Sequence, residues 1–279
     1  MTAGLTFDLK KMKQVVVWRD LTGMTAHEGF LECLHPAPWL VGSWVIAAQG
    51  QWFWALPLSF MFFLTALRLN HEAIHHNLGF TAAGHRVVLH GLSALMAGSN
   101  NAVAANHLHH HRHVMTPSDL EGKCGRMSWL RVLAYGPIFP IEMMRNAWLK
   151  GGLAVRTRMV IDAALNAVML GIWLSTGWNW LAYHLIVVTI AQCCTAYFAV
   201  WITHHGCEDE ALIARTQRSK LINFASYNML FHLEHHMFLG VPVKRLAQLA
   251  TRLDQAVPSI AHQARRVVEW PTSQSRQAL

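Results

Sequence analysis

Histidine is the residue type whose distribution in this chain points to chemistry. Most of the 19 histidines lie in four short stretches, "NHEAIHHN", "HLHHHRHVMTPSD", "WITHHGC" and "FHLEHHMF". Neutral imidazole is the commonest side-chain metal ligand, and four such clusters supply more nitrogens than one tetrahedral zinc ion needs. The sequence therefore predicts a polyhistidine site larger than a single zinc site. Its candidate ligands are His71 and His75, His107, His110 and His111, His204 and His205, and His232, His235 and His236.

The spacing within these stretches fits helices that present several imidazoles on one face. His71 and His75 are four residues apart and share a helix face, whereas His76 is turned about 100° away. The second and fourth stretches share the spacing H-x-x-H-H, which begins at His107 and again at His232. The repetition matters more than either box alone, because a lone histidine on an apolar face is usually a core residue.

Few side chains other than imidazole are available as ligands. Glu72, Asp119 and Glu234 are the carboxylates nearest the histidine stretches. The five cysteines form no C-x-x-C pair and are irregularly spaced, so we expect reduced thiols that pack as small hydrophobic groups. A nitrogen-rich, thiol-free site suits iron, zinc or copper.

The histidine stretches border long apolar segments. The chain is 53% hydrophobic and only 14% charged, which is more apolar than an ordinary soluble domain. Residues 52–69 are long enough to cross a bilayer, whereas the apolar segment before them, residues 37–49, is short for a span. Residues 159–174 and 180–203 form a second apolar pair. We predict two helical hairpins and therefore four transmembrane helices.

The 23 lysines and arginines are confined to the regions between and outside the hairpins, and both hairpin tips lack them. By the positive-inside rule, both termini and the central loop then lie in the cytoplasm, which for a bacterial protein means the inner membrane. The net charge of +8 is therefore a topology signal, and we expect no nucleic-acid partner. All four histidine stretches fall on this cytoplasmic side.

We therefore predict an all-α integral membrane protein in which residues 1–279 form one domain. Four transmembrane helices in two hairpins would carry a histidine-rich cytoplasmic cap. The interrupted apolar stretches at 87–105 and 127–148 are expected to be interfacial helices. The polar residues inside the spans fit helix–helix hydrogen bonds; they are Asp162, Asn166, His184 and Gln192.

The order of the histidine stretches resembles that of the integral-membrane fatty acid desaturase and hydroxylase superfamily. Its members carry three histidine boxes, which here begin at His71, His107 and His232, and the similarity extends over roughly residues 36–249. "NMLFHLEHHMFLGVP" is similar to the third box of acyl desaturases, and "TPSD" occurs in similar form in alkane hydroxylase and desaturase relatives. One departure is Leu239, where many members have proline.

The resemblance implies a non-haem di-iron centre that activates O2 and removes hydrogen from an unactivated C–H bond of a lipid or fatty acyl chain. It implies as metal ligands the histidines named above, with the choice between His204 and His205 left open. Zinc could replace iron after overexpression. Asn228 would hold a metal-bound water, and His76, His109 and His113 would orient ligands.

Several outcomes of the chemistry stay open at this point. Desaturation leads, and hydroxylation, ketone formation and oxidative decarboxylation are alternatives that begin with the same hydrogen abstraction. A metal transporter is a weaker hypothesis, because a transporter should place its ligands within the spans. A zinc-dependent membrane hydrolase is another.

An electron donor is also required, because di-iron O2 chemistry consumes two electrons per turnover. The chain shows no segment resembling a fused redox domain, so we expect a separate acidic carrier such as a ferredoxin. Complementary charge would guide it to the cytoplasmic face. The cations that we expect to receive it are Lys123, Arg126, Arg131, Lys244 and Arg245.

Overall fold

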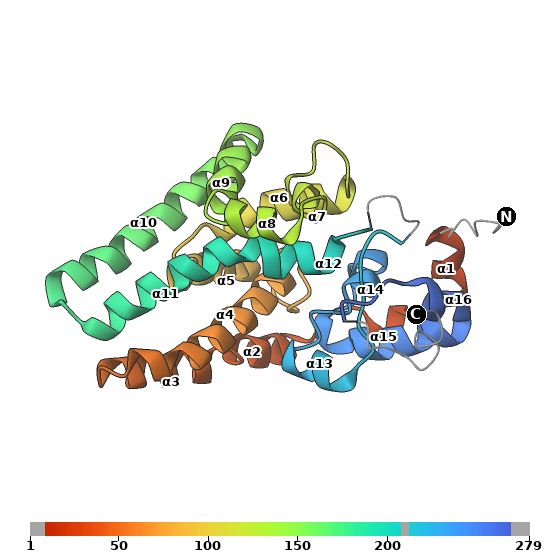
Figure 1. The fold of residues 1–279 in the computed structure, drawn as a ribbon, viewed down its shortest axis with the longest axis horizontal. Coiled ribbons are helices and arrows are strands. Elements are labelled where there is room, and N and C mark those ends of the chain that lie inside the picture. The colour runs from red at the N-terminus through yellow and green to blue at the C-terminus, as the bar shows by residue number, and fades with distance from the viewer. Residues whose placement is uncertain (1–8, 208–211, 269–279) are drawn as a thin grey trace.

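Three long apolar helices form the axis of the fold (Figure 1). The computed structural model describes residues 9–207 and 212–268. Helix α4 spans Trp52–Ile74, α10 spans Gly152–Thr176, and α11 (Asn179–Thr195) continues through a π-helical segment, Ala196–Trp201, into α12 (Ile202–His204). Each of the three is long and apolar enough to cross a membrane. Within the described ranges the chain forms helices and one isolated bridge, but no strand.

The exposure of these helices indicates what surrounds them. Only 6% of the most apolar window of α10 is buried inside the protein, and 17% of that of the helix running from Asn179 to His204. Side chains such as Leu174 (69% exposed) and Ile190 (59% exposed) face outward. An apolar surface of this extent is stable against lipid and not against water, so the three helices are membrane helices.

The segment predicted as the first of four spans is shorter than the other three. Helix α3, Ala37–Ala48, has 12 residues, which corresponds to about 18 Å against a hydrocarbon core of about 30 Å. A break at His35–Pro36 separates it from α2, Ala26–Leu34, because proline cannot continue a helix from its preceding turn. The described residues thus contain three helices of spanning length, and α3 packs beside α4 and α11.

Two groups of shorter helices follow the long ones. The central group is α5 (Ala82–Leu95), α6 (Asn100–Arg112), α7 (Leu120–Gly125), α8 (Trp129–Tyr135) and α9 (Phe139–Lys150). The terminal group is α13 (Lys220–Ala225), α14 (His232–Met237), α15 (Val243–Ala256) and α16 (Pro258–Gln263), beside α1 (Leu9–Val15) and the 3-10 turn η1 (Arg19–Leu21). In Figure 1, α1, α15 and α16 lie at the opposite end of the molecule from the α10–α11 turn.

The two stretches predicted to be interfacial behave differently. Helices α8 and α9 expose apolar side chains including Leu130 (61%) and Ile141 (60%), as expected of helices at a membrane surface. In the stretch at 87–105, Val87 of α5 is 70% exposed, whereas the beginning of α6 is buried, since Asn100, Asn101 and Ala102 are at most 3% exposed. Helix α6 is an internal helix, and it carries the second histidine stretch.

The orientation of the long helices can be tested by labelling. We expect the turn at Gly177, and the α3–α4 turn at Gly50, to lie on the opposite membrane face from His109. Single cysteines are introduced at Ser175, Gln51 and His109 after replacement of the native cysteines. Those at Ser175 and Gln51 should react with an impermeant maleimide from one side of the membrane, and that at His109 from the other side. Labelling of Ser175→Cys and His109→Cys from one side would contradict this arrangement.

Candidate metal centre

Nine histidines that are far apart in the sequence meet in two compact groups. Within each group, one nitrogen from every imidazole lies within 4.8 Å of the others. The first group is His71, His75, His107, His111 and His235; the second is His110, His204, His232 and His236. Each group draws on at least three different helices, so the site exists only in the folded chain.

Four helix ends deliver these side chains. Helix α4 extends past its apolar part, so its last turns carry His71 and leave His75 as the C-terminal cap residue. The last two turns of α6 present His107 and His111 to the first group and His110 to the second. The remaining histidines come from the end of α12 and from the six-residue helix α14.

Contacts between Nε2 atoms define the interior of each group. In the first, His71 lies 2.9 Å from His235, and His111 lies 3.0 Å from both His235 and His107. In the second, the Nε2 of His204 lies 2.9 Å from that of His232 and 3.2 Å from that of His110. An ion with metal–nitrogen bonds of about 2.1 Å holds ligands at right angles about 3.0 Å apart. The separations are therefore those expected between nitrogens that share one ion.

Hydrogen bonds on the other side of the rings assign the tautomers. His110 Nδ1 lies 2.8 Å from an Asp119 carboxylate oxygen, and His204 Nδ1 lies 2.9 Å from the carbonyl oxygen of Ile213. Both oxygens only accept, so in each neutral ring the proton is on Nδ1 and the Nε2 carries a lone pair. With both rings neutral, two lone pairs face each other 3.2 Å apart, and a cation between them would stabilise this arrangement. The chain's own geometry thus fits a bound metal ion.

The first group also contains imidazole nitrogens that a shared cation would satisfy. His107 Nδ1 lies 3.0 Å from a Glu121 oxygen, so its Nε2 carries the lone pair that faces His111. The Nε2 of His75 is buried and has no hydrogen-bond partner among the described side chains. Buried polar atoms are rarely left without a partner, and a shared cation would supply one for this nitrogen.

Burial keeps several of these imidazoles in the form that binds metals. His110 differs: burial lowers its pKa, but the hydrogen bond to Asp119 and the charges of Glu121 and Asp119 raise it above the usual value. Burial first, and the neighbouring histidines second, hold the pKa values of His232, His235 and His236 well below the usual range. The same causes lower the pKa of His111. Ligand imidazoles must be neutral, so these rings are ready to coordinate at neutral pH.

Two carboxylates near the site contact the outer sides of grouped histidine rings. Burial raises the pKa of Asp119 and Glu121, but the contacts with His110 and His107 lower it by more. The net pKa of each carboxyl group is below its usual value, so both stay ionised. Such carboxylate–imidazole pairs fix ring orientation and increase ligand basicity. Asp119 was noted in the sequence as a nearby carboxylate. Glu121 was missed, because its contact with His107 depends on how the short helix α7 packs on α6.

The other residues considered from the sequence lie outside the two groups. His205 stacks on Trp201, with ring centroids 4.4 Å apart, and its Nδ1 lies 2.8 Å from the Gly125 carbonyl oxygen. His76 stacks on His85. His109 Nε2 lies 3.3 Å from the Ser118 hydroxyl, and the His109 ring packs against that of His113. Asn228, with φ of 64°, donates its backbone N–H to Asn223.

These features define a helical membrane protein with two polyhistidine groups at one end of its apolar helices. Comparison with family models finds that residues 43–266 match the family described as "Fatty acid desaturase". The match covers most of the 279 residues, so the chain belongs to this family, and the resemblance seen in the histidine boxes is confirmed. Searches of curated proteins and of solved structures found no match.

Removal of one imidazole tests the centre. We expect His235→Ala to lower the metal content by about one ion per chain, because His235 touches two other members of the first group. His262→Ala, on an exposed residue of α16, is the matched control and should keep the parental content. Elemental analysis of detergent-purified protein measures both. Equal metal content in the two variants would contradict the assignment.

A milder change tests the carboxylate contacts. Asp119→Asn keeps the side-chain shape but removes the charge that holds the Nδ1–H of His110, so metal affinity should fall by about 10- to 100-fold. Competition with a chelator measures this affinity. Asp20→Asn, at an exposed ion pair with Arg252, should leave it unchanged. The same affinity in both variants would show that Asp119 does not act on the site.

Proposed function

We propose that the protein is an O2-dependent, di-iron membrane desaturase that introduces a double bond into a fatty acyl chain. The observation that carries this proposal is the pair of all-imidazole groups, five and four histidines, at one end of apolar helices in a fatty acid desaturase family member. The nitrogen donor set suits iron. We assign the nine grouped histidines as ligands, and His204 in preference to His205.

The reaction balances as R–CH2–CH2–R′ + O2 + 2 e⁻ + 2 H⁺ → R–CH=CH–R′ + 2 H2O. Iron bound at the two groups would supply O2 activation and the abstraction of hydrogen from an unactivated C–H bond. The chain's own residues hold the ligand rings. Asp119 and Glu121 keep the protons of His110 and His107 on Nδ1, and the Ile213 carbonyl does so for His204.

Further hydrogen bonds lock the ligand helices to the rest of the protein. A carboxylate oxygen of Glu72, beside His71 on α4, accepts the backbone N–H of Val243 at the start of α15, at 2.6 Å. Glu234, beside His235, accepts a hydrogen bond from Thr216 at 2.7 Å and pairs with Arg218. These contacts would keep the ligand geometry constant while a substrate chain enters from the lipid.

We place the centre on the cytoplasmic side, with α2 and α3 completing the membrane domain beside three spanning helices. The support is the confinement of lysine and arginine to the histidine-bearing side of the apolar segments. A substrate whose apolar chain lies in the bilayer would then reach the histidine groups from the membrane face.

Product analysis tests the proposal. Iron-loaded protein in lipid nanodiscs is reduced with dithionite under anaerobic conditions and freed of excess dithionite, which itself consumes O2. Supplied then with O2 and a panel of acyl-CoA, acyl carrier protein and phospholipid substrates, it should yield products that have lost two hydrogen atoms. Mass spectrometry distinguishes this from the gain of one oxygen atom, which would indicate hydroxylation. Product formation should be lost in His235→Ala and retained in His262→Ala. Oxygen uptake without an oxidised lipid from any member of the panel would overturn the proposal.

A further inference from the structure

The cations expected from the sequence to receive an electron carrier are largely occupied inside the protein. Lys244 and Arg245 both bind the carboxylate of Glu28, at 3.0 and 2.9 Å. The Thr25 backbone N–H, followed by these two cations, lowers the pKa of Glu28 to about 2. Lys123 binds Glu142 at 3.0 Å. These residues hold helices together, so a carrier would have to replace existing ion pairs to use them.

A different surface, around α1 and η1, keeps two cations out of ion pairs among the described residues, although its third cation, Arg252, pairs with Asp20 at 2.7 Å. Helix α1 has the sequence LKKMKQV, with three lysines and no acidic residue. Lys13 and Arg19 are exposed, and neither forms an ion pair within the described ranges. Lys13 lies over the ring of Phe238 and Arg19 over that of Trp18, at 5.8 and 5.4 Å from the ring centroids. The two cations therefore have fixed positions beside an aromatic pair.

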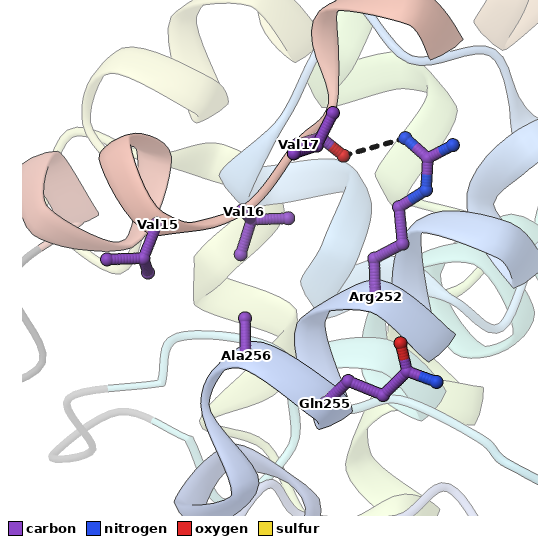
Figure 2. Close-up of a pocket in the computed structure, with 6 residues that line it drawn as sticks. All are labelled: Val15, Val16, Val17, Arg252, Gln255 and Ala256. Carbon is purple, nitrogen blue, oxygen red and sulfur yellow. Dashed lines mark hydrogen bonds between the residues drawn. The ribbon is translucent and has the colours of Figure 1, made fainter.

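An open apolar pocket of about 380 Å³ adjoins these cations. Figure 2 shows that residues at and just after the end of α1 face residues of α15 across this pocket. The guanidinium of Arg252 donates a hydrogen bond to the Val17 carbonyl oxygen at 2.8 Å. Val15 and Val17 are 59% and 71% exposed. An apolar centre with a charged rim is the usual anatomy of a protein interface. The lining residues are Val15, Val16, Val17, Arg252, Gln255 and Ala256.

This surface is connected to the first histidine group. The ring of Trp18 lies 5.4 Å from that of Phe238, and the Phe238 backbone N–H donates to the His235 carbonyl at 3.1 Å. His235 Nε2 is in turn 2.9 Å from His71 Nε2. The rate of electron transfer falls steeply with distance. The route from Trp18 to His235 consists of one contact between packed rings and one backbone hydrogen bond.

We propose that α1, η1 and the adjoining face of α15 form the docking site of a small, acidic one-electron carrier protein, with Trp18 and Phe238 between the carrier and the histidines. This inference rests on the proposed function. Two reduced carriers would each lose one electron per turnover, which supplies the two electrons in the equation above. The site lies at the opposite end of the molecule from the α10–α11 turn (Figure 1), which favours a soluble partner over a lipid surface.

Binding measurements test the proposal without turnover. The probe is an acidic plant-type [2Fe–2S] ferredoxin, titrated against the full-length, metal-loaded protein in zwitterionic nanodiscs. Lys13→Gln/Arg19→Gln should raise the Kd about fivefold to tenfold at low salt and reduce its salt dependence, because rim charges govern encounter. Val17→Glu should weaken binding similarly by placing a negative charge in the apolar centre.

The matched control is Arg131→Gln/Lys150→Gln, which removes the same charge from exposed residues of α8 and α9. This control should bind the ferredoxin as the parent does. An equal rise in Kd in both double variants would show a general charge effect and overturn the proposal. Unchanged ferredoxin binding in Val17→Glu would also overturn it. So would a Lys13→Gln/Arg19→Gln variant that binds ferredoxin as the parent does but has lost binding to anionic vesicles.

A rate measurement separates docking from the chemistry. With reduced ferredoxin as donor, Lys13→Gln/Arg19→Gln should raise the KM for ferredoxin. The product formed in a single turnover, when O2 is added after anaerobic reduction with dithionite and removal of its excess, should stay parental. Parental product from the dithionite-reduced protein, combined with an unchanged ferredoxin KM, would overturn the docking site alone. Absence of product with either donor in the parent protein would overturn the proposed function, and the Kd values would still decide the docking question.

Discussion

The structure depends on the convergence of nine imidazole nitrogens at two buried points. Neutral imidazoles whose lone pairs face one another at about 3 Å repel, and burial removes the water that could mediate between them. A shared cation would remove this repulsion, so metal binding would stabilise the fold. The helices that bring these rings together must therefore be held by other contacts strong enough to keep the groups close.

Those contacts lie on the far sides of the ligand rings and on their immediate neighbours. The carboxylates of Asp119 and Glu121 make α7 a support for two rings of α6. Glu72 and Glu234 do the same for α4 and α14 by contacting neighbouring backbone and side chains. Acidic residues near the histidine boxes thus act as supports, which explains how a site with scarce carboxylates remains all-imidazole.

The sequence predicted the parts of the site that follow from local spacing. The shared face of His71 and His75, the H-x-x-H-H boxes and the long apolar helices all depend on helical periodicity. Contacts that depend on packing were not predictable. Glu121 reaches His107 through the packing of α7, and α6 is internal although its apolar residues resembled an interfacial stretch. The short apolar segment predicted at 37–49 is α3, Ala37–Ala48, and its part in a fourth span stays a prediction.

The choice between His204 and His205 shows why helical periodicity alone was insufficient. The helix that carries them contains a π-helical segment at Ala196–Trp201, and π-helical turns occur often at functional sites. One extra residue in a turn rotates everything that follows by about 100°. In an uninterrupted α-helix, Thr203 would occupy the direction that His204 takes here. The π-helical segment thus directs His204 to the second group, and His205 is left to stack on Trp201 and contact Gly125 on α7.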